Sequence, residues 1–141
     1  MRETPPRKRS ADARPPLDGL LCAMVLAPRT YARNRFFRLF ELPDYARVRQ
    51  RAKHVRGLIR EVLGVGSRKA EIIGTQVLDD RVLLKLCVQG LNYERTTSLT
   101  LLEWSLVNYA LCRAEGARAS AEDEALVTES LQALGADLPI P

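Results

Sequence analysis

The chain has 141 residues, of which 46% are hydrophobic and 28% are charged, a composition typical of a globular domain rather than of a disordered polymer. Its longest apolar run, residues 20–27, is far shorter than the roughly 20 residues of a membrane-spanning helix, and no small-residue cleavage motif follows it as in a secretory signal. We therefore expect one soluble, cytoplasmic domain without a membrane segment, located in the nucleus or nucleoid if it binds nucleic acid.

Charge is distributed unevenly along the chain. Residues 1–70 hold 17 Lys and Arg against 6 Asp and Glu, and residues 71–141 hold 5 against 11, within a net charge of +5. Such asymmetry is typical of proteins that bind nucleic acid or another anionic surface. It could also arise without an anionic partner. The two halves could neutralise each other within one fold or across a dimer, and the excess of Arg over Lys, 18 to 4, could reflect a GC-rich coding sequence.

The N-terminal segment differs in composition from the rest. Residues 1–16 contain four prolines and five basic residues without apolar periodicity, so we expect them to form a disordered basic arm. Residues 17–135 carry regular hydrophobic patterns and are expected to fold as a single α+β domain, with a C-terminal tail at 136–141. The arm could contact phosphates, or it could be a solvated tail without function.

Three helices are predicted in the first half of the domain. Asp18 can cap a short helix that Pro28 stops, and Thr30 can cap a second helix with an aromatic face, over about 30–42. The third and clearest helix runs over about 43–63. Its apolar residues recur at spacings of three and four and form one ridge, made of Tyr45, Val48, Ala52, Val55, Ile59 and Val62.

Cationic residues flank this ridge on both sides. Because successive residues are turned by about 100° around a helix, four of them fall on one stripe and two on the opposite side of the ridge. Guanidinium groups bind phosphates through paired hydrogen bonds, so the helix is expected to offer two cationic edges. The stripe consists of Arg49, Lys53, Arg56 and Arg60, and the other edge carries Arg47 and Arg51.

After this helix the hydrophobic pattern changes to that of strands. Residues 72–78 and 81–89 alternate in the way expected of two strands, with a tight turn at Asp79-Asp80 between them. A third short strand is predicted over 91–97, and the change of parity at Gly90 predicts a bulge or a turn there.

Two more helices are predicted after these strands. Thr100 and Glu103 form a capping box for the first of them, and Ser120 caps a last amphipathic helix that Gly135 ends. The helix that begins after Thr100 is apolar around nearly its whole circumference, Trp104 included. Such a helix is expected to lie at the centre of the core or to be covered by a second subunit.

The expected fold is therefore α+β, with a small antiparallel β-sheet (a hairpin at about 70–97) packed with about five helices. Three helices followed by a hairpin resemble the order of a winged-helix DNA-binding domain. This resemblance implies that the third helix contacts DNA, that the hairpin is the wing and that the C-terminal helices dimerise. The strand and two helices over 91–134 resemble a ribbon-helix-helix repressor, although this half of the chain is acidic.

No catalytic or metal-binding pattern is found in the sequence. The single histidine, His54, falls opposite the apolar ridge and is expected to be exposed, with no nucleophile and acid suggested beside it. The pair Asp79-Asp80 is typical of a turn. We therefore predict a protein that is not an enzyme and has neither cofactor nor metal. The three cysteines are expected to be buried, reduced thiols, because they lie far apart in apolar stretches at Cys22, Cys87 and Cys112.

These observations predict a non-enzymatic nucleic-acid-associated or regulatory protein that contacts phosphates through an Arg-rich helix. The alternative is a homodimeric protein-interaction or adaptor module, whose basic surface meets an acidic protein partner and whose Trp104 helix forms the subunit contact. The residues predicted to contact nucleic acid are Arg49, Lys53, Arg56 and Arg60 on the third helix and Arg33 and Arg38 on the second.

Overall fold

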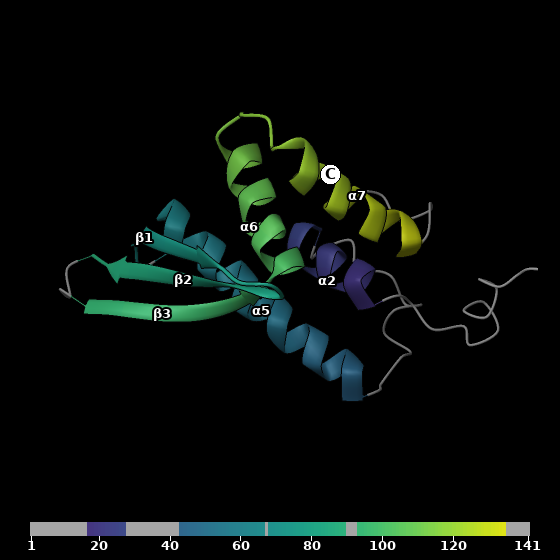
Figure 1. Ribbon diagram of the computed structural model, residues 1–141, viewed down its shortest axis with the longest axis horizontal. Helices are drawn as coiled ribbons and strands as arrows, with labels where there is room; N and C mark the ends of the chain where they lie inside the picture. The colour runs from purple at the N-terminus through teal and green to yellow at the C-terminus, as the bar shows by residue number, and fades with distance from the viewer. Residues whose placement is uncertain (1–16, 28–42, 67, 90–92, 135–141) are drawn as a thin grey trace, which may run out of the picture.

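The computed structural model describes residues 17–27, 43–66, 68–89 and 93–134. These residues form an α+β fold, in which a three-stranded antiparallel sheet is preceded and followed by helices (Figure 1). The elements are α2 (Leu17–Leu26), α5 (Pro43–Leu63), β1 (Ala70–Val77), β2 (Arg81–Val88), β3 (Tyr93–Thr100), α6 (Leu101–Ala114) and α7 (Ala121–Leu134).

The α+β class is confirmed, and the number of helices differs from the expectation. The described residues contain four helices rather than about five. The aromatic helix predicted over 30–42 lies outside the described residues, as do the arm at 1–16, the tail at 136–141 and the bulge or turn predicted at Gly90.

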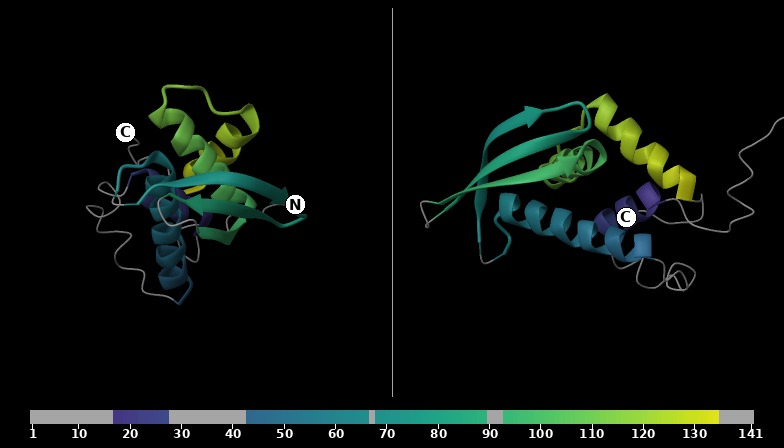
Figure 2. Two further views of the ribbon diagram at one scale, coloured as in Figure 1. Left: turned by 90° about the vertical axis from the view of Figure 1, so that its left-hand side faces the viewer. Right: turned by 60° about the horizontal axis from the view of Figure 1, so that its bottom comes forward.

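The sheet is a simple meander in which β2 lies between β1 and β3. A turn at Asp79-Asp80 joins the first two strands, and the Leu78 N–H donates to the Arg81 carbonyl across it at 2.8 Å. The alternation predicted for β2 is confirmed, because four alternate side chains are buried under the helices that lie on this side of the sheet (Figure 2). These residues are Val82, Leu84, Leu86 and Val88.

One irregularity of the sheet was not predicted. The pairing of β1 with β2 shifts between Ile72 and Gly74, so that Ile73 has no partner on β2 and its side chain is 44% exposed. A bulge of this kind kinks an edge strand and makes it a poorer template for another strand. The bulge lies in the apolar run of β1, where apolar and polar residues do not alternate, so the sequence pattern could not reveal it.

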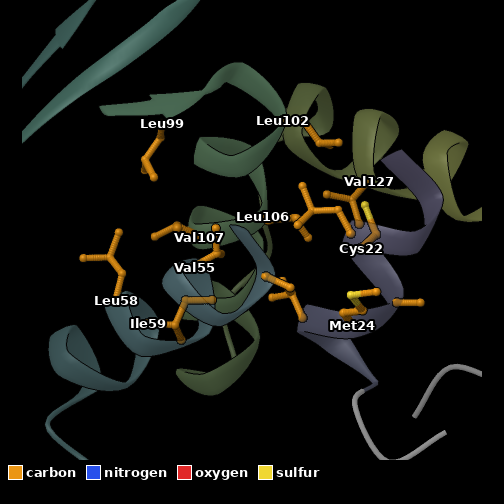
Figure 3. Close-up of a cluster of buried hydrophobic side chains, with 14 of the residues drawn as sticks. Cys22, Met24, Val55, Leu58, Ile59, Leu99, Leu102, Leu106, Val107 and Val127 are labelled. Atoms are coloured by element: carbon orange, nitrogen blue, oxygen red, sulfur yellow. The ribbon is translucent and has the colours of Figure 1, made fainter. Parts of the chain in front are cut away.

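The hydrophobic core lies where α2 meets α5, α6 and α7 (Figure 1). Six consecutive residues of α2, 20–25, are buried, so this helix is apolar all round and enclosed by its neighbours. Figure 3 shows side chains of four helices and β3 converging on this cluster, with Val55 of α5 near Val107 of α6. The ridge predicted on α5 is confirmed for Ala52, Val55 and Ile59, which are all buried.

Both predicted N-terminal caps of the C-terminal helices are present. The Thr100 hydroxyl accepts from the Glu103 N–H at 3.1 Å, and the Glu103 carboxylate accepts from the Thr100 N–H at 3.0 Å, which completes a capping box. The Ser120 hydroxyl accepts from the Asp123 N–H in the same way for α7. Because Thr100 is also the last residue of β3, this box fixes where α6 leaves the sheet.

Although α6 is apolar around nearly its whole circumference, only part of its surface is buried. Leu106 and Val107 are fully buried, whereas Trp104 packs against the core cluster and is only half-buried. In α7, Val127 is buried, whereas Leu126 is 37% exposed. None of the helices in the described part of the chain has the length and hydropathy that a bilayer crossing requires.

The cysteines are unpaired, as predicted, but only one of them is fully buried. Cys22 lies in the core, whereas Cys87 and Cys112 are half-buried. Desolvation by burial, assisted by the negative charge of Asp18, raises the pKa of the Cys22 thiol to about 12. Cys22 is therefore an inert structural thiol at neutral pH.

Candidate nucleic-acid interface and the neighbouring groove

The candidate interface is the exposed surface of α5, a 21-residue helix that crosses the molecule below the sheet (Figure 2). Its apolar ridge faces α2 and α6, which leaves two edges for polar residues. These edges lie on opposite sides of the ridge and differ in their surroundings.

The predicted stripe is present on one edge and is exposed along its length. Its four residues come together because spacings of four, three and four place them on the same side of about three helical turns. None of the ion pairs that we find among the described residues uses Lys53, Arg56 or Arg60. The exposed residues are Arg49, Lys53, Arg56 and Arg60, while Arg33 and Arg38, predicted to join them, lie outside the described residues.

The cationic surface continues past the C-terminal end of α5. Gly64 has a positive φ of 70° and ends the helix in the left-handed conformation that glycine adopts without strain. The turn brings the Lys69 side chain to 3.1 Å from the position that a Cβ on Gly64 would take. A nitrogen of the Arg60 guanidinium lies 3.9 Å from the corresponding position on Gly66. Basic side chains therefore gather at a helix C-terminus, where the helix dipole favours positive charge.

The opposite edge was predicted to be a second cationic edge, but its Arg51 is neutralised by a carboxylate of α6. Arg51 donates from Nε to Glu103 Oε2 at 2.7 Å and from Nη2 to Glu103 Oε1 at 2.5 Å, a bidentate ion pair. It also donates to the Ser98 carbonyl at 3.1 Å. The Glu103 side chain is only 2% exposed, and its hydrogen bonds raise the pKa of Arg51 above its ordinary value. Arg51 therefore joins α5 to α6 and β3.

A polar groove lies between this edge and β3. No Cα atom of α5 lies within 8 Å of one in β3, so only long side chains cross the space between them. The Arg95 Nη2 donates to Glu61 Oε1 at 2.5 Å, and the His54 Nε2 and the Thr97 hydroxyl are 2.9 Å apart. A cavity of about 320 Å³ lies here, and its lining residues are Lys53, His54, Gly57, Leu58, Glu61, Arg95, Thr96 and Thr97.

The imidazole in this groove has an altered proton affinity. His54 is exposed, as predicted, but the hydrogen bond to Thr97 was not anticipated. Desolvation lowers the pKa of His54 below its ordinary value, and the positive charge of Arg51 lowers it further. The ring is therefore neutral at pH 7, and the positive charge among the cavity residues comes from Lys53 and Arg95.

The other chemical candidates in the sequence do not assemble into a site. In the described ranges, no three His, Cys, Asp or Glu side chains gather closely enough to hold a metal ion. Asp79 and Asp80 are exposed at the tip of the hairpin, where Asp80 lies 3.7 Å from Arg81.

Comparison with known proteins adds no relative to these observations. No family model, curated protein or solved structure matches the chain. The resemblances to winged-helix and ribbon-helix-helix domains therefore gain no support from any matched structure.

Proposed function

We propose that this is a nucleic-acid-associated protein that binds the phosphate backbone through the exposed stripe of α5. The observation that carries the proposal is the contrast in pairing on one helix: Arg51 is held by a buried carboxylate, whereas Arg56 and Arg60 are exposed and outside the ion pairs found. Contacts of Lys and Arg with phosphates supply most of the sequence-independent affinity for nucleic acid.

The distribution of negative charge supports the same surface. Three acidic residues stand in the first turn of α7, a helix that does not contact α5, and there they complement the helix dipole. Asp79 and Asp80 lie at the tip of the hairpin. A polyanion that approaches the stripe edge of α5 meets four exposed cations, and repulsion among these like charges is relieved when phosphates bind. The acidic residues of α7 are Glu122, Asp123 and Glu124.

The test removes two charges from the stripe and two from elsewhere. Arg56→Gln with Arg60→Gln should weaken binding to random-sequence DNA and RNA and make the dependence of log K on log salt shallower, by about one unit per lost phosphate contact. The matched control is Arg81→Gln with Arg118→Gln, which lowers the net charge equally at exposed positions in the hairpin and the α6–α7 connection. If both double variants lose the same affinity, only the net charge matters and the stripe is not the interface.

The second candidate is a homodimeric adaptor that uses the basic surface to bind an acidic protein. The observation in its favour lies in α6, where Trp104 is half-buried and Leu101 is 42% exposed, so that this helix keeps apolar surface outside the core. Sedimentation equilibrium distinguishes the two candidates. A stable dimer that Trp104→Ala dissociates, together with no binding of DNA or RNA at low salt, would replace the first proposal with this one.

A further inference from the structure

The groove between α5 and β3 contains a glycine that the fold does not require. Gly57 lies in the middle of α5, where glycine destabilises a helix by about 1 kcal/mol relative to alanine. Its backbone is helical and does not have the positive φ that demands glycine. A Cβ built at this position would meet no atom within 4 Å. Packing within the described part of the protein therefore gives no reason for the missing side chain.

The missing side chain does have an effect on the groove. Gly57 lies on the same face of α5 as His54 and Glu61, which both reach towards β3, and it lines the same cavity. Any larger residue would project into this space. The glycine therefore keeps open a cavity of about 320 Å³, which is within the usual range of small-molecule sites.

The lining of the cavity indicates the chemistry of its ligand. Lys53 and Arg95 provide positive charge, and Glu61 occupies only one of the five N–H donors of Arg95. Glu61 itself is a carboxylate acceptor, which disfavours a ligand that carries negative charge alone. The hydroxyls of Thr96 and Thr97 can both donate and accept. This combination suits a molecule with one phosphate and a neutral part that is rich in hydroxyl or amino groups.

We propose that the groove around Gly57 is a binding site for a small phosphorylated molecule of the nucleotide class. Lys53 and Arg95 bind the phosphate, while Glu61 and Thr96 accept hydrogen bonds from the ribose or the base. The site lies on the sheet side of α5 and does not depend on polyanion binding by the stripe, although Lys53 belongs to both. The same chemistry could come from a free nucleotide or from the 5′ end of a bound strand, and the experiment separates these sources.

The experiment titrates the full chain with AMP, CMP, GMP and UMP by calorimetry, with inorganic phosphate, adenosine and a 5′-phosphorylated oligonucleotide as further probes. At least one free monophosphate should bind saturably, about tenfold or more tightly than phosphate or adenosine. Gly57→Leu projects a side chain into the cavity and should weaken this binding about tenfold or more, whereas Gln50→Leu places the same side chain at an exposed position of the same helix and should not. Circular dichroism checks that both variants fold.

The outcomes separate this proposal from that of the stripe. Arg56→Gln with Arg60→Gln should lose DNA affinity and keep nucleotide affinity, and Gly57→Leu should do the reverse. If only the 5′-phosphorylated oligonucleotide binds, and Gly57→Leu weakens it, the source is a strand end rather than a free nucleotide. The proposal is overturned if none of the probes binds saturably, if phosphate alone binds as tightly as every nucleotide, or if Gly57→Leu binds like the parent.

Discussion

The two edges of α5 carry similar residues and have different surroundings. One edge holds Arg51, His54 and Glu61, each of which contacts a residue of β3 or α6. The other holds the stripe, which is exposed and ends in a cluster with Lys69 beyond the helix. Pairing with a buried carboxylate thus makes Arg51 a structural residue, whereas Arg56 and Arg60 are exposed and are the residues proposed to bind phosphates. This carboxylate, Glu103, lies 52 residues from Arg51 in the chain.

The largest change in stability that follows from this comparison is expected when Arg51 is substituted. Arg51→Ala leaves the buried Glu103 carboxylate without its cation, which should destabilise the protein by about 2–3 kcal/mol, below the full value for a buried pair because Arg51 is itself partly exposed. Arg56→Ala removes the same charge from the stripe and should change stability by less than about 0.5 kcal/mol. Urea unfolding followed by circular dichroism measures both values.

A second substitution tests why Arg51→Ala loses stability. Glu103→Gln removes the buried charge and keeps an acceptor for the Thr100 N–H. In the Arg51→Ala background it should therefore restore part of the lost stability, with a coupling of about 1 kcal/mol or more between the two sites. Additive losses in the double variant would mean that the ion pair does not hold α6 to α5.

The same contrast shows what the sequence could predict and what it could not. The caps at Thr100 and Ser120 and the alternation of β2 depend on neighbours within a few residues, so their patterns predicted them correctly. Pairing across the fold has no such local signal. Glu61 finds Arg95 only because the sheet returns to α5 after 34 residues, and the buried Glu103 was expected only as a cap.

Of the candidate site, the sequence predicted the stripe but not the neighbouring groove. Helical spacing alone identified the stripe on α5, and all four of its residues are exposed as expected. The groove was missed because β3 supplies one side of it and because the sequence pattern assigned no role to Gly57. A glycine in the interior of an otherwise regular helix was the signal available in the sequence.

A smaller change in stability, this time a gain, is expected when Gly57 is replaced by alanine. Gly57→Ala adds a methyl group that meets no atom within 4 Å and replaces the poorest ordinary helix former with the best. It should therefore stabilise the protein by about 0.5–1 kcal/mol, which thermal unfolding would show as a higher Tm. Loss of stability would mean that the groove is closed in solution, because the methyl group would then have met another side chain.

The smallest expected effect concerns His54, the titrating group on the sheet-facing edge. Desolvation first, and Arg51 second, lower the pKa of His54 in the folded protein, while the unfolded imidazole titrates near 6.5. Between the two pKa values the unfolded chain binds a proton that the folded chain does not. The free energy of unfolding contributed by His54 therefore rises with pH in this window, is fully present above about pH 6.5, and is lost as the pH falls towards the folded pKa.

Since the chain has a single histidine, the proton NMR signals of the ring report the folded pKa without ambiguity, and the midpoint of this titration should lie below 6.5. His54→Gln should keep a hydrogen-bonding group near Thr97 and flatten the pH dependence of urea unfolding below about pH 6.5 relative to the parent. A native midpoint at or above 6.5 would mean that Glu61 and Glu103, the two carboxylates that raise this pKa, outweigh burial and Arg51, and that this edge is more open to water than the structure shows.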